Sequence, residues 1–176
     1  ACPSGTHQHA AGQTSCTACA AGKFHNGAPA SSDEATSCTA CQSGKYQPTT
    51  AQGSCIDCVA GKYRNTADAS SGENSACTAC ESGKYQNIPA LLACVACEAG
   101  KFRNNEDASS SETQACTACQ SGKYQPTAGQ TSCIDCAAGK YRDSDPASST
   151  ETDACTACGT GTFQDQPAQT SCTDCA

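Results

Sequence analysis

Nineteen cysteines in a fixed alternating spacing are the feature of this sequence that most limits its possible folds. After Cys2, nine C-x-x-C pairs follow, and their second cysteines lie at positions 19, 41, 58, 80, 97, 119, 136, 158 and 175. The steps alternate between 22 and 17 residues without exception. A fixed period of this length is typical of repeat architectures. We therefore interpret residues 1–176 as one tandem array of alternating short (17-residue) and long (22-residue) modules, a 39-residue double repeat truncated at both ends.

The composition does not supply a conventional hydrophobic core. Only ten residues are Ile, Leu, Val or Phe, and Met and Trp are absent. Burying an apolar side chain contributes about 1.5–3 kcal/mol, whereas ordering the backbone of one residue costs about 1–2 kcal/mol. The chain needs another source of stability, and cysteine at this frequency indicates disulfide bonds formed in an oxidising compartment. We expect an extracellular or cell-surface protein.

The charge and the hydropathy argue against two classes of partner. The formal net charge is −7, whereas binding to nucleic acid or to an anionic membrane requires clustered Lys and Arg. No stretch approaches the roughly 20 apolar residues of a membrane-spanning helix. We therefore expect no nucleic-acid partner and no direct membrane insertion within this segment.

Every module after the first opens with the same short motif, Cys, two residues, Gly, Lys or Thr, and an aromatic ring. His7 takes the ring position in the first module. The glycine permits a tight turn, and the ring supplies most of the apolar surface of its module. The residue after the ring is Gln in short modules and Arg, or once His25, in long ones. The eight module aromatics are Phe24, Tyr46, Tyr63, Tyr85, Phe102, Tyr124, Tyr141 and Phe163.

Each long module also contains five extra residues in a segment rich in Ser and acidic side chains. These segments fit the S-x-x-E capping box, in which Ser caps the helix and Glu is its third residue. We predict one short helical turn in each long module. The four Ser–Glu pairs are Ser31 and Glu34, Ser70 and Glu73, Ser109 and Glu112, and Ser148 and Glu151.

The C-x-x-C pairs have three possible roles: zinc ligands, redox centres and structural disulfides. Cys16, Cys19, Cys38 and Cys41 have a spacing inside the zinc-ribbon range. However, the same opening motif follows every pair, whereas zinc sites would make alternate intervals differ in character. A redox pair needs the helix N-terminus of a βαβ fold, which this chain lacks. We therefore favour structural disulfides and expect no metal site.

Two disulfide schemes are conceivable, closure of each C-x-x-C pair on itself or serial bridges between successive pairs. Self-closure would give small rings that join nothing distant. Serial bridging closes loops of about 15–20 residues, each contributing roughly 3 kcal/mol in chain-entropy models, and it leaves Cys175 unpaired. The serial scheme predicts the bridges Cys2–Cys16, Cys19–Cys38, Cys41–Cys55, Cys58–Cys77, Cys80–Cys94, Cys97–Cys116, Cys119–Cys133, Cys136–Cys155 and Cys158–Cys172.

The module C-x-x-G-[KT]-[YF]…C-x-x-C resembles the cysteine-rich repeats of tumour-necrosis-factor receptors and, more closely, the related ephrin-receptor-like repeats. The long tandem run with fillers such as "CTAC" is also similar to ciliate immobilisation antigens and similar protist surface proteins. The resemblance covers the whole chain. It implies that the opening cysteine bridges to the first cysteine of the next pair, with the aromatic ring beside the bridge.

These patterns predict small disulfide-rich repeats that form an elongated solenoid or rod, with little regular secondary structure beyond short β-hairpins. We expect no enzymatic activity, because the only histidines, His7, His9 and His25, lie near the start and cannot form a repeated site. We expect no cofactor. Calcium at the loop acids is the weaker alternative to a solvated acidic surface. Any glycans would be O-linked, because no N-x-[ST] sequon is present.

Two functions agree with this sequence. The first is an extracellular structural protein that forms a coat, stalk or filament by self-association, favoured because nearly identical repeats offer the same contact again and again. The second is a receptor or adhesion ectodomain that binds a protein ligand. In such a protein we would expect the modules that contact the ligand to differ in sequence from the others. The main anomaly is "NIPALLAC" at residues 87–94, where Ile88, Leu91 and Leu92 form a local apolar cluster. We interpret this cluster as a locally packed turn rather than a contact surface.

Overall fold

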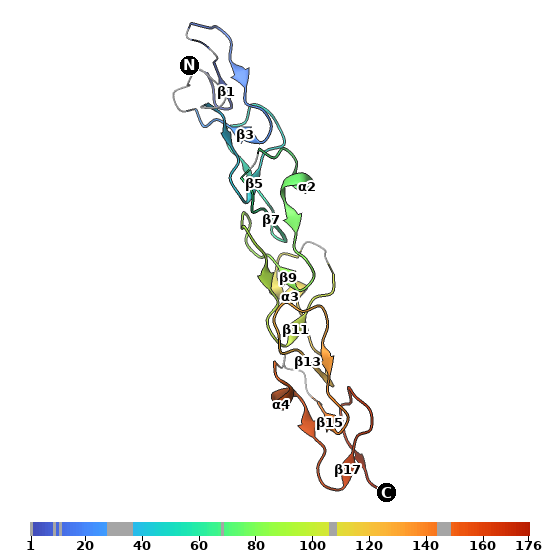
Figure 1. Cartoon of the computed structure of the whole chain (residues 1–176). Helices are drawn as coiled ribbons and strands as arrows, with labels where there is room; N and C mark the ends of the chain where they lie inside the picture. The colour runs from blue at the N-terminus through green and yellow to red at the C-terminus, as the bar shows by residue number, and fades with distance from the viewer. Residues whose placement is uncertain are drawn as a thin grey trace. The chain divides into compact units, whose positions relative to one another are not determined.

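A computed structural model describes residues 2–8, 10, 12–27, 37–67, 69–105, 109–143 and 149–176. By its backbone contacts the chain divides into two compact units, and Figure 1 labels many of the strands and helices named below. The first unit comprises Ala1–Ala79 and Ile88–Cys94, and the second comprises Cys80–Asn87 and Val95–Ala176. We number the modules 1 to 9 by their opening cysteines, Cys2, Cys19, Cys41, Cys58, Cys80, Cys97, Cys119, Cys136 and Cys158.

Each module forms one antiparallel hairpin of two very short strands. The first strand is the pair of residues that ends in the ring, and the second is the pair between the two cysteines of the next C-x-x-C. In module 3, Lys45 lies opposite Asp57 and Tyr46 opposite Ile56. The strands are β1 Thr6–His7, β2 Thr17–Ala18, β3 Lys23–Phe24, β4 Thr39–Ala40, β5 Lys45–Tyr46, β6 Ile56–Asp57, β7 Lys62–Tyr63, β8 Thr78–Ala79, β9 Lys84–Tyr85, β10 Val95–Ala96, β11 Lys101–Phe102, β12 Thr117–Ala118, β13 Lys123–Tyr124, β14 Ile134–Asp135, β15 Lys140–Tyr141, β16 Thr156–Ala157, β17 Thr162–Phe163 and β18 Thr173–Asp174.

Disulfides close the modules in series. Eight bridges have Cα–Cα distances of 5.6 to 5.8 Å, which is ordinary disulfide geometry. They are Cys2–Cys16, Cys19–Cys38, Cys41–Cys55, Cys58–Cys77, Cys97–Cys116, Cys119–Cys133, Cys136–Cys155 and Cys158–Cys172. Cys80 and Cys94 are also disulfide-bonded, and Cys175 is a free, exposed thiol. The chain is therefore a series of small disulfide-rich repeats with little regular structure.

Backbone hydrogen bonds join three of the long modules to the short module after them in the same way. Between modules 6 and 7, the Gly100 N–H donates to Gln125 O at 2.7 Å, and the Cys119 N–H donates to Gly100 O at 2.9 Å. A third bond joins the loop of module 7 to the opening cysteine of module 6, where the Gly129 N–H donates to Cys97 O at 2.8 Å. The same bonds recur between modules 2 and 3 and between modules 8 and 9. This ladder pairs backbone groups that the two-residue strands leave unpaired, as buried backbone requires.

The helical turns form in three long modules, as α2 Glu73–Ala76, α3 Glu112–Ala115 and α4 Glu151–Ala154. The predicted capping boxes, however, are wrong for Ser70 and Ser109. The glutamate is the first helical residue, not the third, and the residues at the N-cap are Gly72, Ser111 and Thr150.

The reason for this shift is a backbone contact with the preceding module. The carbonyls of Ser70 and Ser109 accept hydrogen bonds from Gln47 N and Gln86 N at 3.2 and 3.3 Å, where the chain is not yet helical. The caps follow later: Ser111 Oγ accepts from Gln114 N, and Thr150 Oγ1 accepts from Asp153 N. The Ser31–Glu34 pair and Ser148 lie outside the described residues.

Candidate functional site at the module junctions

Two kinds of junction between neighbouring modules occur within the two units. Where a short module precedes a long one, the ring of the short module is covered by the disulfide and the helical alanine of the long module. Tyr46 is 8% exposed and packs against Cys58, Cys77 and Ala76. We call this a closed junction. Two further closed junctions place the buried Tyr85 with Cys97, Ala115 and Cys116, and the half-buried Tyr124 with Cys136, Ala154 and Cys155.

His7 takes the place of the ring at the closed junction between modules 1 and 2. Its imidazole is buried, and Nδ1 lies 3.5 Å from Cys38 Sγ in the Cys19–Cys38 bridge. Among the described residues, His7, Cys19 and Cys38 are the one group of three potential metal ligands that lie close together. Because the two sulfurs are bonded to each other, neither is available as a thiolate ligand. The group is a histidine packed on a disulfide.

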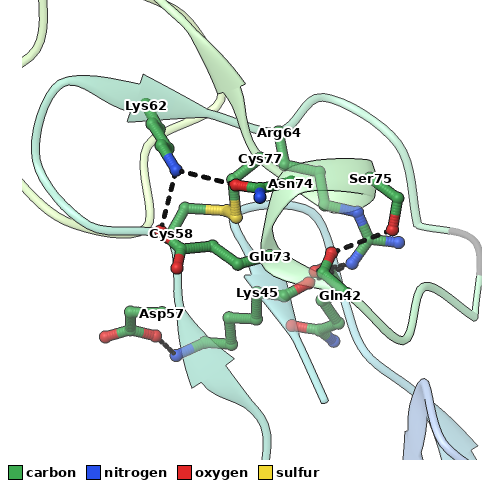
Figure 2. The surroundings of a disulfide bond; sticks show 11 residues. Gln42, Lys45, Asp57, Cys58, Lys62, Arg64, Glu73, Asn74, Ser75 and Cys77 are labelled. Carbon is green, nitrogen blue, oxygen red and sulfur yellow. Dashed lines mark hydrogen bonds and ion pairs between the residues drawn. A yellow bond between two sulfur atoms is a disulfide. The ribbon is translucent and has the colours of Figure 1, made fainter. Parts of the chain in front are cut away.

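The residue after the ring in long modules is a buried arginine that binds the main chain of the preceding module. Arg64, Arg103 and Arg142 are 2%, 1% and 4% exposed. Figure 2 shows the Arg64 guanidinium reaching the main chain at Gln42 and Lys45, and its Nη1 donates to both carbonyls. Hydrogen bonds from a charged donor are worth about 1.5–3 kcal/mol. Arg64 therefore fastens module 4 to the opening turn of module 3.

The same contact recurs in the second unit. Arg103 Nη1 donates to the carbonyls of Lys84 and Glu81. The Arg142 guanidinium donates to the carbonyls of Lys123, Gln120 and Cys119. In module 2 the buried His25 occupies this position, and its Nδ1 has no hydrogen-bond partner within the described part of the chain.

The residue after the ring in short modules is a glutamine that ties together its own loop. Gln47 Nε2 donates to Ser54 O at 2.7 Å, and its Oε1 accepts from Thr49 N at 3.2 Å. Gln125 and Gln164 bond to their own loops through the same two atoms. The two residue types therefore have different roles, since Gln shapes one module and Arg joins two.

The opening glycines have a second function that the sequence pattern does not reveal. Besides their positive φ angles, several lie directly against the backbone of the module after next. A Cβ on Gly44 would overlap the carbonyl of Ala90, and one on Gly83 would overlap that of Gly129. Gly5, Gly22 and Gly122 meet the backbone at Ala51, Ala69 and Ala168 in the same way. The modules therefore contact not only their immediate neighbours but also the module after the neighbour.

The lysines of the hairpins pair with acidic side chains of the same module. In short module 3, Lys45 pairs across the hairpin with Asp57 (Figure 2). Lys123 pairs with Asp135 in the same way in module 7. In the long modules the partner is the glutamate that begins the helix, at Nζ–Oε1 distances of 3.1 Å for Lys62–Glu73, 2.5 Å for Lys101–Glu112 and 2.6 Å for Lys140–Glu151. All five of these acidic side chains thus have lysine partners.

Replacing Glu112 by glutamine tests this pairing. The hydrogen bond from Lys101 to Glu112 outweighs the effect of burial and raises the pKa of Lys101 above its ordinary value of 10.5. Because the folded-state pKa is raised, the stabilisation is fully present below the unfolded pKa and is lost as the pH rises through the folded one. We expect Glu112→Gln to bring the Lys101 pKa down towards 10.5 and to lower the free energy of unfolding at pH 7 by less than about 1 kcal/mol. NMR titration of the lysine side chains measures the shift.

The control for this prediction is Glu98→Gln. Glu98 lies 3.9 Å from Lys101 Nζ and its side chain is 76% exposed, so its removal should change the Lys101 pKa less. An equal effect of the two substitutions would contradict the assigned pairing.

Three junctions at which a long module precedes a short one stay open, those between modules 2 and 3, 6 and 7, and 8 and 9. The short module lacks the helical insert, so nothing equivalent to Ala76 covers the ring of the preceding long module. Phe24, Phe102 and Tyr141 remain half-buried, and each lines a pocket. The three pockets have volumes of about 320 Å³ at Phe102, 270 Å³ at Phe24 and 480 Å³ at Tyr141.

Comparison with known proteins identifies the repeat. The family model described as tyrosine-protein kinase ephrin type A/B receptor-like matches residues 1–35, 27–74 and 107–153, which together cover more than half of the chain. The chain belongs to this ephrin-receptor-like family. No curated protein matches the sequence significantly. The family and the disulfide-rich repeats indicate an extracellular domain of the secreted type. No helix in the described residues is long and apolar enough to cross a membrane.

Proposed function

We propose that the chain is an extracellular structural protein, a disulfide-laddered rod that forms a cell-surface coat, stalk or filament by self-association, without catalytic activity. The observation that most supports this proposal is that the recurring residues make their contacts within the chain itself. The opening glycines, the rings of the short modules, the buried arginines and the glutamines all bind other parts of the same chain. Recurring residues whose contacts hold the modules of one chain together are what a structural spacer, or the repeating subunit of an assembly, requires.

Small-angle scattering combined with sedimentation velocity tests this proposal. A compact domain of this length would have a radius of gyration of about 16 Å, and a rod should exceed this by about twofold. Sedimentation should show association that increases with protein concentration. A compact, monomeric particle over the whole concentration range would overturn the proposal.

The alternative function is a receptor or adhesion ectodomain, and one observation favours it. The interpretation of residues 87–94 as a locally packed turn is wrong for two side chains, because Ile88 and Leu92 are 54% and 53% exposed. At the equivalent positions, module 7 has Thr127 and Thr131. Module 5 therefore differs from module 7 in having two exposed apolar side chains. If these two side chains bind a protein ligand, the Ile88→Thr, Leu92→Thr double variant should lose that binding while an elongated monomer persists in scattering.

A further inference from the structure

We propose that the open junctions are a repeated binding site for a neutral oligosaccharide chain, with one sugar-binding pocket at each junction. This inference is independent of the structural role proposed above. It starts from the recurrence of the pocket: one lies in the first unit, at modules 2 and 3, and two lie in the second unit, at modules 6 and 7 and at modules 8 and 9. The cause is the same in each case, a short module without the helical insert.

The parts that all three pockets share are neutral. Each has an aromatic ring from the long module, and a serine with the adjacent disulfide cysteine from the short module. The shared sets are Phe24, Ser54 and Cys55; Phe102, Ser132 and Cys133; and Tyr141, Ser171 and Cys172.

The charges at the pockets do not favour an ionic ligand. Lys45 and Lys123 line two of the pockets, but both are paired with an aspartate. The third pocket has Thr162 at this position, and Asp143 also lines it. Since the charge differs between pockets while the ring and the serine recur, the common ligand should be neutral.

A pyranose sugar has the matching chemistry. One face of the ring is a layer of C–H groups, which packs on the negative face of an aromatic ring. Its hydroxyls need donors and acceptors at the rim, and pockets with an apolar floor and a few polar groups are the usual form of ligand sites. The rim of the pocket at Phe102 supplies Asn104, Thr117, Gln120 and Thr131.

A peptide added as an extra strand is less well matched. That mode of binding needs unpaired main-chain groups at the edge of the site. The carbonyls of the three pocket serines already accept hydrogen bonds from glutamine side chains, Ser54 from Gln47 at 2.7 Å and Ser132 from Gln125 at 2.6 Å. Ser171 accepts from Gln164 at 2.8 Å. Side chains therefore supply most of the recognition, which suits a sugar.

The repetition of the pocket indicates a polymeric ligand. Single shallow pockets bind weakly, but linked sites convert the second binding event into an intramolecular one. The pockets at Phe102 and Tyr141 lie in the same unit, one 39-residue repeat apart. A glycan long enough to reach both would bind more tightly than a short oligosaccharide.

NMR titration of the intact oxidised chain tests the site, with neutral hexasaccharides of β-glucose, α-glucose, mannose and N-acetylglucosamine at up to about 10 mM, which detects affinities in the millimolar range. We expect at least one sugar to shift the ring signals of Phe24, Phe102 and Tyr141. The rings of Tyr46 and Tyr85, which are buried at closed junctions, serve as controls in the same sample and should not move. Absence of shifts with every sugar, or equal shifts of both sets of rings, would overturn the proposal.

Two substitutions locate the site. Ser132→Phe places a ring in the pocket at Phe102 and keeps the carbonyl that Gln125 uses, so the fold should persist and the Phe102 shifts should disappear. With a long polymer of the sugar that binds, Ser132→Phe should reduce affinity by up to about 10²-fold by removing one linked site. The matched control is Ala137→Phe, an exposed position at which other long modules have Ala20, Val59 and Glu98. Loss of binding in the Ala137 variant as well would contradict the assignment to the pocket.

Discussion

Gly83→Ala should destabilise the second unit by more than about 4 kcal/mol, a loss that is exceptional for a single methyl group. Gly83 has φ +82°, and a Cβ there would overlap the carbonyl of Gly129. The opposing atoms are backbone, so they cannot rotate away as a side chain would. Modules 5 and 7 would have to separate. Native-state hydrogen exchange should show lost protection at Gly129, whose N–H donates to Cys97 O, and chemical denaturation should show the loss of stability.

Gly161→Ala separates the two causes of this effect. Gly161 has a similar φ of +86°, but no described atom lies within 4 Å of the added Cβ. Only the strain of placing alanine in a left-handed backbone conformation remains, and it amounts to about 1–2 kcal/mol. If both substitutions had the same effect, the close approach between modules 5 and 7 would not contribute to stability.

Arg103→Ala should have the second-largest effect, a loss of about 3–5 kcal/mol. The Arg103 guanidinium is 1% exposed and donates to the carbonyls of Lys84 and Glu81 in the preceding module. Removing it eliminates charge-assisted hydrogen bonds and leaves carbonyls buried without that donor, which adds their desolvation penalty. Denaturation of the oxidised protein measures the loss. Arg103→His should lose less, because His25 occupies the same position in module 2.

Lys84→Ala is the matched control. It removes the side chain of a residue whose carbonyl Arg103 binds, and it leaves that carbonyl in place. The Lys84 side chain is 44% exposed and its carboxylate partner Glu81 is 68% exposed, at 3.7 Å. Such a surface pair is worth about 0–1 kcal/mol. A larger loss for Lys84→Ala than for Arg103→Ala would show that the main-chain contact is not what joins these modules.

Most of the fold can be predicted from the cysteine spacing, because each disulfide closes a short loop of the chain. The module boundaries, the hairpin at each ring and the helical turn of the long modules can all be predicted from the sequence, since each depends on residues within one closed loop. The residue at which the helix begins could not be predicted from the sequence. It depends on the carbonyls of Ser70 and Ser109 being taken by Gln47 and Gln86 of the preceding module, and an S-x-x-E pattern contains no information about that contact.

The contacts between modules were visible in the sequence only as unexplained regularities. The change from Gln to Arg after the ring follows the module type, but its meaning requires knowing that Arg64 reaches back to Gln42 and Lys45. The sequence explains the opening glycine only as a residue that permits a tight turn. Its contact with a loop 46 residues further on, as between Gly44 and Ala90, follows only from how the modules stack.

The open junctions were likewise not predicted, although their cause is in the sequence. Five residues fewer in each short module mean that no helical alanine covers the preceding ring. Phe102 and Tyr85 share one sequence motif, yet Tyr85 is buried against Cys97 and Ala115, whereas Phe102 lines a pocket. The difference lies in the length of the following module, not in the ring itself.

Disulfide mapping of the unreduced protein tests the central claim, that serial bridges define the modules, most directly. The protein would be digested without reduction and the linked peptides identified by mass spectrometry. Peptides joined through Cys41–Cys55, Cys58–Cys77 and Cys97–Cys116, with a single reactive thiol at Cys175, are the predicted result. Bridges closed within C-x-x-C pairs, or free thiols released together with zinc, would contradict it.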